Sequence, residues 1–442
     1  MHALLTAAYV LLFFALFYRG RLAGKSGIPG PWLAGAFLVK FAAGMGLWAV
    51  YTYHYTYRDT SDAMRYFDNG MVLYGYLKDD PALFFKLLFG IGLDAPDMQP
   101  VLDRFNGWNM AYNYGLPNDN PTIIRLNALI AIFSFGHYHV HTAFMCMLST
   151  WGLARIYRGL TAWVHGRRRV LFLALFAAPS VVFWGSGVLK EAPVLALLGS
   201  LVGGWLVSEK EGWHVRRALG VLLGVCGLVV LKMYVLLALV PGLLSWVVIR
   251  RWPGRAGLKA LGVHVLCAAL ALNASWIYPP GDALYILSKK QTDFYNVAEA
   301  MEAGSTVEIP PIEGLWSAMK AFPGALYNAY FRPDVTEVSS AFYAGLAVEN
   351  AVVMLLLLAA VALGGWTHAP PALRWWVWSF VVLYGWMVGL TVPILGAVVR
   401  YKVPALGFLL AGCFLGTWGR MAEGWLARWM PFKAGTPPAP QG

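Results

Sequence analysis

The stretch ALLTAAYVLLFFALFY, residues 3–18, contains no charged side chain. A transmembrane helix needs about 20 consecutive and mostly apolar residues to cross the hydrocarbon core of a bilayer. The stretch comes close to that length, and it lacks the basic start and the small-residue cleavage site of a secretory signal. We therefore predict a first membrane helix that stays in the mature protein.

The rest of the chain has the same apolar character. Of its 442 residues, 59% are apolar and 13% are charged, and the mean hydropathy is positive. Soluble globular proteins usually carry about 25% charged residues. We predict an all-α polytopic membrane protein, a single integral membrane domain over residues 1–442 with about eleven transmembrane helices. These spans are expected near residues 2–18, 31–52, 138–157, 169–186, 188–207, 216–233, 234–250, 257–277, 345–364, 373–391 and 402–418, and the pairs that flank Gly187 and Met233 are alternatively re-entrant.

The net charge of +12 comes mainly from short basic loops such as RGRLAGK, residues 19–25, and IRRWPGR, residues 249–255. Lys and Arg concentrate in the cytoplasmic loops of membrane proteins, so this pattern indicates topology and not a nucleic-acid partner. We predict a protein of the bacterial inner membrane, in contact with membrane lipids, with a periplasmic N-terminus and a cytoplasmic tail over residues 419–442. The four cysteines lie inside apolar runs at unrelated spacings, which is the pattern of neither a disulfide framework nor a zinc site.

Two long segments are expected outside the cytoplasm, at residues 53–137 and 278–344. The first ends in a stretch with helical periodicity, and we predict an amphipathic surface helix over residues 123–133 because the stretch is too short and too polar to span. The second contains helical stretches with proline breaks, including a predicted surface helix over residues 315–322. Long loops with ordered structure are usually functional.

An acidic motif begins the first of these loops: YTYHYTYRDTSDAMRYFDNG, residues 51–70. In a helix, Asp59, Asp62, Tyr66 and Asn69 would share one face. A partly desolvated carboxylate at the mouth of a helix bundle can take a proton from a sugar hydroxyl or hold a divalent cation. The alternative is a solvated helix start preceded by an interfacial belt of tyrosines.

Two further motifs place charges at the predicted outer face. Lys190 and Glu191 follow a Gly-Ser-Gly turn, and Arg400, Tyr401 and Lys402 precede the last predicted span. Cations in these positions suit a lipid-borne phosphate, which Arg contacts bidentately and Lys as a point charge. The alternatives are snorkelling and interfacial anchoring. Weaker candidates for substrate contacts are Tyr66, Arg65, Glu191, Arg125, Lys232 and Arg332.

The alternating histidines of GHYHVHT, His137, His139 and His141, raise the question of a metal site. In a helix this spacing brings only the first and the last of them near one another. We therefore expect polar contacts near the membrane surface and no metal site at these histidines.

The layout resembles the C-type membrane glycosyltransferases (the GT-C superfamily) and a bacterial family of membrane proteins from polysaccharide gene clusters. The resemblance rests on four stretches in order along the chain: YTYHYTYRDTSDAMRYF, PSVVFWGSGVLKE, FRP with AVENAVV, and VVRYKVPALGFLL. The chain differs from the usual pattern in having two spans before the acidic loop and no clear Asp-Glu pair.

This resemblance implies transfer of a sugar from a polyprenyl-phosphate donor to a glycan or lipid acceptor at the periplasmic face. Asp62 or Asp59 would be the general base, and Arg400, Lys402 and Lys190 would stabilise the departing lipid phosphate. It implies no required cofactor, and a divalent cation such as Mg or Mn, held by Asp59 and Asp62, is optional.

Two alternatives stay open. A polysaccharide polymerase or ligase acting on lipid-linked repeats needs the basic cluster more than the acidic motif. A lipid-glycan transporter or flippase usually has repeated halves and ionisable residues at mid-membrane, whereas no repeat is visible here and the charges cluster at the predicted outer edge.

Overall fold

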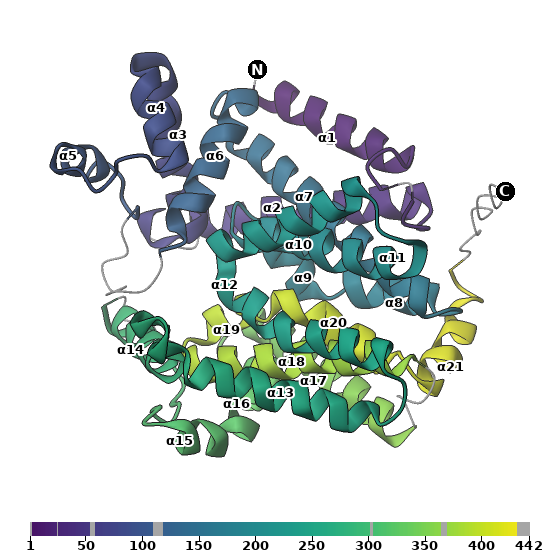
Figure 1. The fold of residues 1–442 in the computed structure, drawn as a ribbon. Helices are drawn as coiled ribbons and strands as arrows, with labels where there is room; N and C mark the ends of the chain where they lie inside the picture. The colour runs from purple at the N-terminus through teal and green to yellow at the C-terminus, as the bar shows by residue number, and fades with distance from the viewer. Residues whose placement is uncertain are drawn as a thin grey trace. The chain divides into compact units, whose positions relative to one another are not determined.

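The computed structural model describes residues 2–23, 25–53, 58–108, 118–300, 304–363 and 369–430. Within these ranges the chain forms helices and no β-strand, apart from a single bridge between Thr306 and Ile394 (Figure 1). The prediction of an all-α protein is therefore confirmed for the described residues.

Five of the described helices are long and apolar enough to cross a membrane, or up to seven spans if each of two bent pairs counts as one. The five are α2 (Gly30–Tyr53), the continuous helix Glu191–Glu211, α12 (Val215–Arg251), α17 (Ala341–Ala362) and α18 (Pro371–Thr391). The bent pairs are α6 (Asn120–Ser134) with α7 (Tyr138–Trp163), and α19 (Leu395–Tyr401) with α20 (Val403–Cys413). These helices are consistent with a multi-pass membrane protein.

The count of about eleven spans is not reached, for identifiable physical reasons. Residues 169–186 are split into α8 (Arg168–Phe176) and α9 (Pro179–Trp184), since Pro179 has no amide hydrogen to donate to the helix that precedes it and its ring disfavours continuation of that helix. The predicted spans at residues 2–18 and 257–277 become α1 (His2–Tyr18) and α13 (Ala256–Leu272), which are only 17 residues each. Two predicted spans around Met233 fall within α12, whose backbone leaves the helical region at Lys232 (φ −155°, ψ 75°).

The predicted loops are largely helical as well. Residues 53–137 contain α3 (Asp62–Asp79), α4 (Pro81–Phe89), α5 (Gln99–Leu102) and α6, and residues 278–344 contain α14 (Ala283–Ala300), α15 (Leu315–Lys320) and α16 (Phe322–Phe331). Helices are confirmed where the periodicity predicted surface helices, at α6 and at α15 with the start of α16. The C-terminal helix α21 (Thr417–Leu426) follows α20.

The chain separates into two compact units. In the described part of the chain, the first unit comprises residues 2–158 and 182–232, and the second comprises residues 159–181 and 233–430. The predicted single domain stays a prediction, and each unit is described by itself below.

In the first unit α3 packs along α6, and α1 packs along α2. Close approach of two backbones is visible where α7 meets the Glu191–Glu211 helix, which has π-helical geometry at Gly199–Gly203 (η3). A Cβ atom added at Gly199 would lie 2.3 Å from the carbonyl oxygen of Gly152. Small residues are what allows membrane helices to come this close.

In the second unit α18 is the central helix, and it packs against α14, α16 and α20. Helix α20 also contacts α8 and α17. Tyr330 of α16 donates a hydrogen bond from its hydroxyl to the carbonyl oxygen of Val381 at 2.6 Å. That bond satisfies a buried polar group and ties α16 to α18.

Candidate functional site

The acidic motif forms two separate helical segments. Ser61 has extended backbone angles and accepts a hydrogen bond from the amide of Met64, so it is the N-cap of α3 and Asp62 is the first helical residue. Asp59 belongs to the preceding 3₁₀ turn, η1 (Arg58–Thr60). The expectation that Asp59 and Asp62 lie on one helix is therefore wrong, because the cap at Ser61 separates them. The side chain of Asp59 lies outside the described residues.

A third carboxylate of the motif is bound by an arginine. Arg58 contacts Asp68 bidentately, with Nε 2.8 Å from Oδ2 and Nη2 2.7 Å from Oδ1. This hydrogen bond to Asp68 raises the pKa of the Arg58 guanidinium. The pair joins η1 to α3 and gives Asp68 a structural role.

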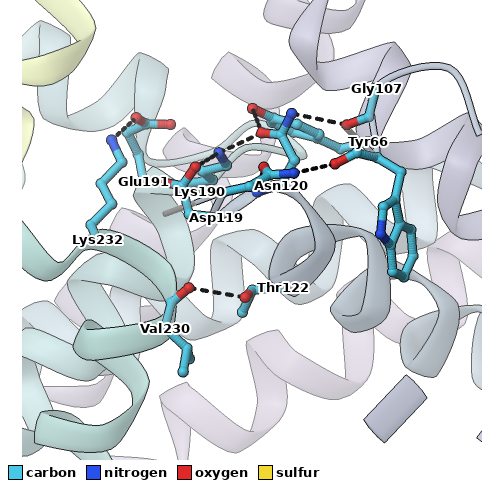
Figure 2. Close-up of polar contacts among 11 residues, drawn as sticks. Tyr66, Gly107, Asp119, Asn120, Thr122, Lys190, Glu191, Val230 and Lys232 are labelled. Atoms are coloured by element: carbon cyan, nitrogen blue, oxygen red, sulfur yellow. Dashed lines mark hydrogen bonds and ion pairs between the residues drawn. The ribbon is translucent and has the colours of Figure 1, made fainter. Parts of the chain in front are cut away.

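A polar cluster of the first unit surrounds the ammonium of Lys190, whose side chain is only 5% exposed (Figure 2). Its Nζ donates hydrogen bonds of 2.7 Å each to Asp119 Oδ1 and to Asn120 Oδ1. The hydroxyl of Tyr66 donates to the same Asn120 oxygen at 3.2 Å, and the ammonium lies 5.1 Å from the centre of the Tyr66 ring. A buried ammonium needs such partners, since burying a charge without them is very costly.

The cluster is built from three segments of the first unit: α3 carries Tyr66, the start of α6 carries Asn120, and the residue before α10 (Glu191–Leu198) is Lys190. Asp119 is the N-cap of α6, but its carboxylate contacts Lys190 and does not cap the helix. The structure therefore brings the predicted residues Tyr66 and Lys190 together.

A glycine between Arg65 and Asn120 supports the cluster from one side. Gly107 has a φ of +110°, which favours glycine, and a Cβ atom there would lie 2.5 Å from Cδ of Arg65. Its carbonyl oxygen accepts a hydrogen bond from Nδ2 of Asn120 at 2.9 Å. Asn69 lies four residues after Arg65 on α3, and its Nδ2 donates to the carbonyl oxygens of Arg65 and Asn106.

A second buried ion pair joins Glu191, the residue after Lys190, to Lys232. Nζ of Lys232 is 2.9 Å from Oε1 of Glu191, and the two side chains are 2% and 0% exposed. Lys232 occupies the break in α12, where its backbone is not helical. The pair joins that break to the start of α10 (Figure 2).

Arg125 lies on α6 and does not join the Lys190 cluster in any described contact. It donates from Nε to the carbonyl oxygen of Leu87 at 2.9 Å, and its guanidinium lies 5.2 Å from the centre of a Trp108 ring. These contacts tie α4 to α6, so Arg125 is a structural residue in this arrangement.

The basic motif of the second unit is also buried. Lys402 is 0% exposed and hydrogen-bonds through Nζ to Oδ1 of Asn350, whose Nδ2 donates to the carbonyl oxygen of Pro333. Arg400 is 8% exposed. Tyr401 accepts a hydrogen bond at its carbonyl oxygen from the hydroxyl of Tyr384.

Arg332 contributes to a half-buried network at the end of α16. Its Nε lies 3.1 Å from Oε1 of Glu337. Nearby, hydrogen bonds from Thr336 and from the hydroxyl of Tyr327 lower the pKa of Asp334, and the bond to Asp334 raises the pKa of Tyr327. This network orders the segment after α16.

Of the three histidines, His141 makes polar contacts with two neighbouring side chains. The ring of His141 lies 2.8 Å from Oδ1 of Asn127 through Nδ1 and 2.7 Å from the hydroxyl of Ser134 through Nε2. Among the described residues, no group of three or more His, Cys, Asp and Glu side chains is arranged to hold a metal ion.

Sequence reasoning missed Asp119 and Asn120. The sequence feature at this place is Asn-Asp-Asn-Pro, residues 118–121, since Asp or Asn before a proline in the first turn is typical of a helix start. That signal predicts a helix cap, whereas the structure uses the carboxylate and the amide as partners of a buried lysine.

Comparison of the chain with protein-family models, with curated proteins and with solved structures gives no match.

Proposed function

We propose that the protein is a glycosyltransferase of the bacterial inner membrane that uses a polyprenyl-phosphate sugar donor. The observation that supports this proposal most is the Lys190 cluster, in which the helix of the acidic motif contributes Tyr66 beside a buried cation. The proposed topology has about eleven spans when short and broken helices are counted. Both long loops lie on the periplasmic side, where the donor headgroup and the glycan or lipid acceptor would meet.

In the proposed reaction, an acceptor hydroxyl attacks the anomeric carbon of the donor sugar. The bond between that carbon and the phosphate oxygen breaks, and the lipid phosphate leaves with the electron pair. Asp62 or Asp59 takes the hydroxyl proton, a role worth about 10² to 10⁴ in rate. Lys190 is the cation of the first unit proposed to stabilise the phosphate. Arg400 and Lys402 of the second unit stay phosphate contacts predicted from the sequence.

The direct test is sugar transfer by the full-length protein in proteoliposomes, with a radiolabelled polyprenyl-phosphate hexose as donor and a lipid extract as acceptor. Asp62→Asn or Asp59→Asn should lower the rate about 100-fold or more, because the amide cannot take the proton. Lys190→Gln should lower it as well, by removing a charge that stabilises the leaving phosphate.

Asp79→Asn is the matched control, since Asp79 ends the same helix α3 and is exposed. If the Asp62 and Asp59 variants both keep the activity of the control, the assignment of the base is wrong. If the wild-type protein transfers no hexose or pentose from any polyprenyl-phosphate donor, the proposed function is wrong.

A transporter of lipid-linked glycan is a second candidate, and the Glu191–Lys232 pair favours it. Both side chains are almost fully buried in helices that are long and apolar enough to span a membrane. Ionisable pairs in such positions commonly mark the path of a transported substrate. In the same proteoliposomes, transport would appear as movement of the labelled donor between leaflets without sugar transfer.

A further inference from the structure

A second feature of the first unit is an apolar groove of about 270 Å³. Its wall is formed by α6, α7, the Glu191–Glu211 helix and the first part of α12, all within the same unit. The lining residues are Thr122, Leu126, Leu148, Trp151, Pro193, Ala196, Leu197, Ser200, Leu223, Gly227, Val230 and Leu231. Apolar lining of this kind suits hydrocarbon.

The walls of the groove come close in sequence to the Lys190 cluster and to the Glu191–Lys232 pair. Thr122, which donates a hydrogen bond to the carbonyl oxygen of Val230 at 3.0 Å, belongs to the wall and lies two residues after Asn120. On two other walls, Pro193 follows Lys190 by three residues and Leu231 directly precedes Lys232. Three of the groove's walls therefore come within three residues of an ion-pair residue, Asp119, Lys190 or Lys232, and Figure 2 shows both ion pairs together with the Thr122–Val230 bond.

From this juxtaposition we propose that the groove binds the polyprenyl chain of the lipid-linked donor, with the phosphate at Lys190. An apolar groove whose walls are close in sequence to a buried lysine matches a molecule with a long hydrocarbon chain and an anionic end. Asp119, whose side chain is 29% exposed, occupies the anion position on Lys190 while no phosphate is bound. A donor phosphate takes this position and displaces the Asp119 carboxylate.

The groove is small. Pockets for drug-sized ligands measure about 300–1,000 Å³, so about 270 Å³ holds only part of a long hydrocarbon chain. That the bound hydrocarbon belongs to the donor rests on the proposed function. That the groove suits hydrocarbon rests on its apolar lining alone.

The test is photolabelling of the full-length protein in phosphatidylcholine nanodiscs by a polyprenyl phosphate that carries a diazirine on its chain and no sugar. The label should map to peptides of α6, α10 and the first part of α12. Leu126→Trp fills the groove from α6 and should lower labelling about tenfold or more, and Lys190→Gln should lower it too by removing the anion's partner. Leu129→Trp is the matched control, because Leu129 lies on α6, is 40% exposed and does not line the groove.

Labelling that maps elsewhere, or that is equal in the Leu126→Trp and Leu129→Trp proteins, would overturn the proposal. So would full competition by an equal amount of phosphatidylglycerol, which would make the groove a general lipid site. Because the probe carries no sugar, labelling of the groove in a protein without transfer activity would refute the proposed enzyme while supporting the site. Transfer activity without labelling of the groove would support the proposed enzyme and refute the proposed binding site.

Discussion

Lys190 and Lys232 are both buried lysines of the first unit, and their partners differ. Lys190 contacts a carboxylate that is 29% exposed and an amide, whereas Lys232 contacts a carboxylate with no exposed surface. An anion that arrives from outside can replace Asp119 more readily than Glu191, because Asp119 is already partly hydrated. At the scale of the residue, Lys190 is suited to exchange its partner and Lys232 is suited to keep its partner.

The Glu191–Lys232 pair makes a stability prediction. Glu191→Gln leaves the Lys232 ammonium buried without its carboxylate, and breaking a buried pair on one side costs about 3–5 kcal/mol. We expect a lower midpoint of thermal unfolding in detergent, followed by tryptophan fluorescence. The double variant Glu191→Gln with Lys232→Met should recover much of the loss, since it removes both charges of the buried pair.

An exposed pair supplies the control for that prediction. Glu211 contacts Arg158 and Arg217, and its side chain is 43% exposed. Such pairs are worth about 0–1 kcal/mol, so Glu211→Gln should change the midpoint little. If the midpoint of thermal unfolding falls equally in the Glu191→Gln and Glu211→Gln proteins, burial of the ion pair does not determine the cost of breaking it.

At the scale of the element, helix ends decide where side chains can meet. The cap at Ser61 starts α3 at Asp62, which separates Asp62 from Asp59. The break at Lys232 divides α12 and lets a lysine from its middle contact Glu191. In both places a local departure from helical geometry positions a charged residue.

The contact between α21 and α8 is a further case and carries a prediction. Oε2 of Glu423 accepts hydrogen bonds from the amides of Arg169 at 2.8 Å and Val170 at 3.0 Å, at the helix end where amides lack partners within the helix. Glu423→Ala should cost about 1–3 kcal/mol by leaving these amides unsatisfied. We expect faster tryptic cleavage at Arg420 and Arg428.

Met421→Ala is the control for this change, because Met421 lies on the same helix and is 59% exposed. Cleavage that is no faster in the Glu423→Ala protein than in the Met421→Ala protein would show that the carboxylate does not hold α21.

At the scale of the whole molecule, the proposed topology can be measured by cysteine labelling. In a Cys226→Ser, Cys267→Ser background, Asp94→Cys and Glu313→Cys place an exposed thiol in each long loop, and Arg168→Cys places one in a predicted cytoplasmic loop. A membrane-impermeant maleimide should label residues 94 and 313 in intact spheroplasts and residue 168 only after lysis. Labelling of residue 168 before lysis would contradict the proposed orientation.

Local sequence accounts for much of the fold. Long apolar runs with a single charged residue each predicted the helices α2, α17 and α18 to within a few residues, because a run of apolar side chains favours a buried or lipid-facing helix. Helical periodicity predicted α6. The number of spans was harder to predict from the sequence. Short apolar runs do not show whether a helix continues past a residue such as Pro179 or breaks at one such as Lys232.

The sequence by itself determined that the protein is helical and apolar enough for a membrane, and it identified Lys190, Glu191, Lys232 and Tyr66 as candidates. Only the tertiary structure decided their partners. Lys190 meets Asp119 and Asn120 across about 70 positions of sequence, and Lys232 meets Glu191 across 41. Periodicity describes which face a residue occupies on its own helix, whereas the cost of burying a charge is met by whichever group the packing of another helix brings within hydrogen-bonding distance.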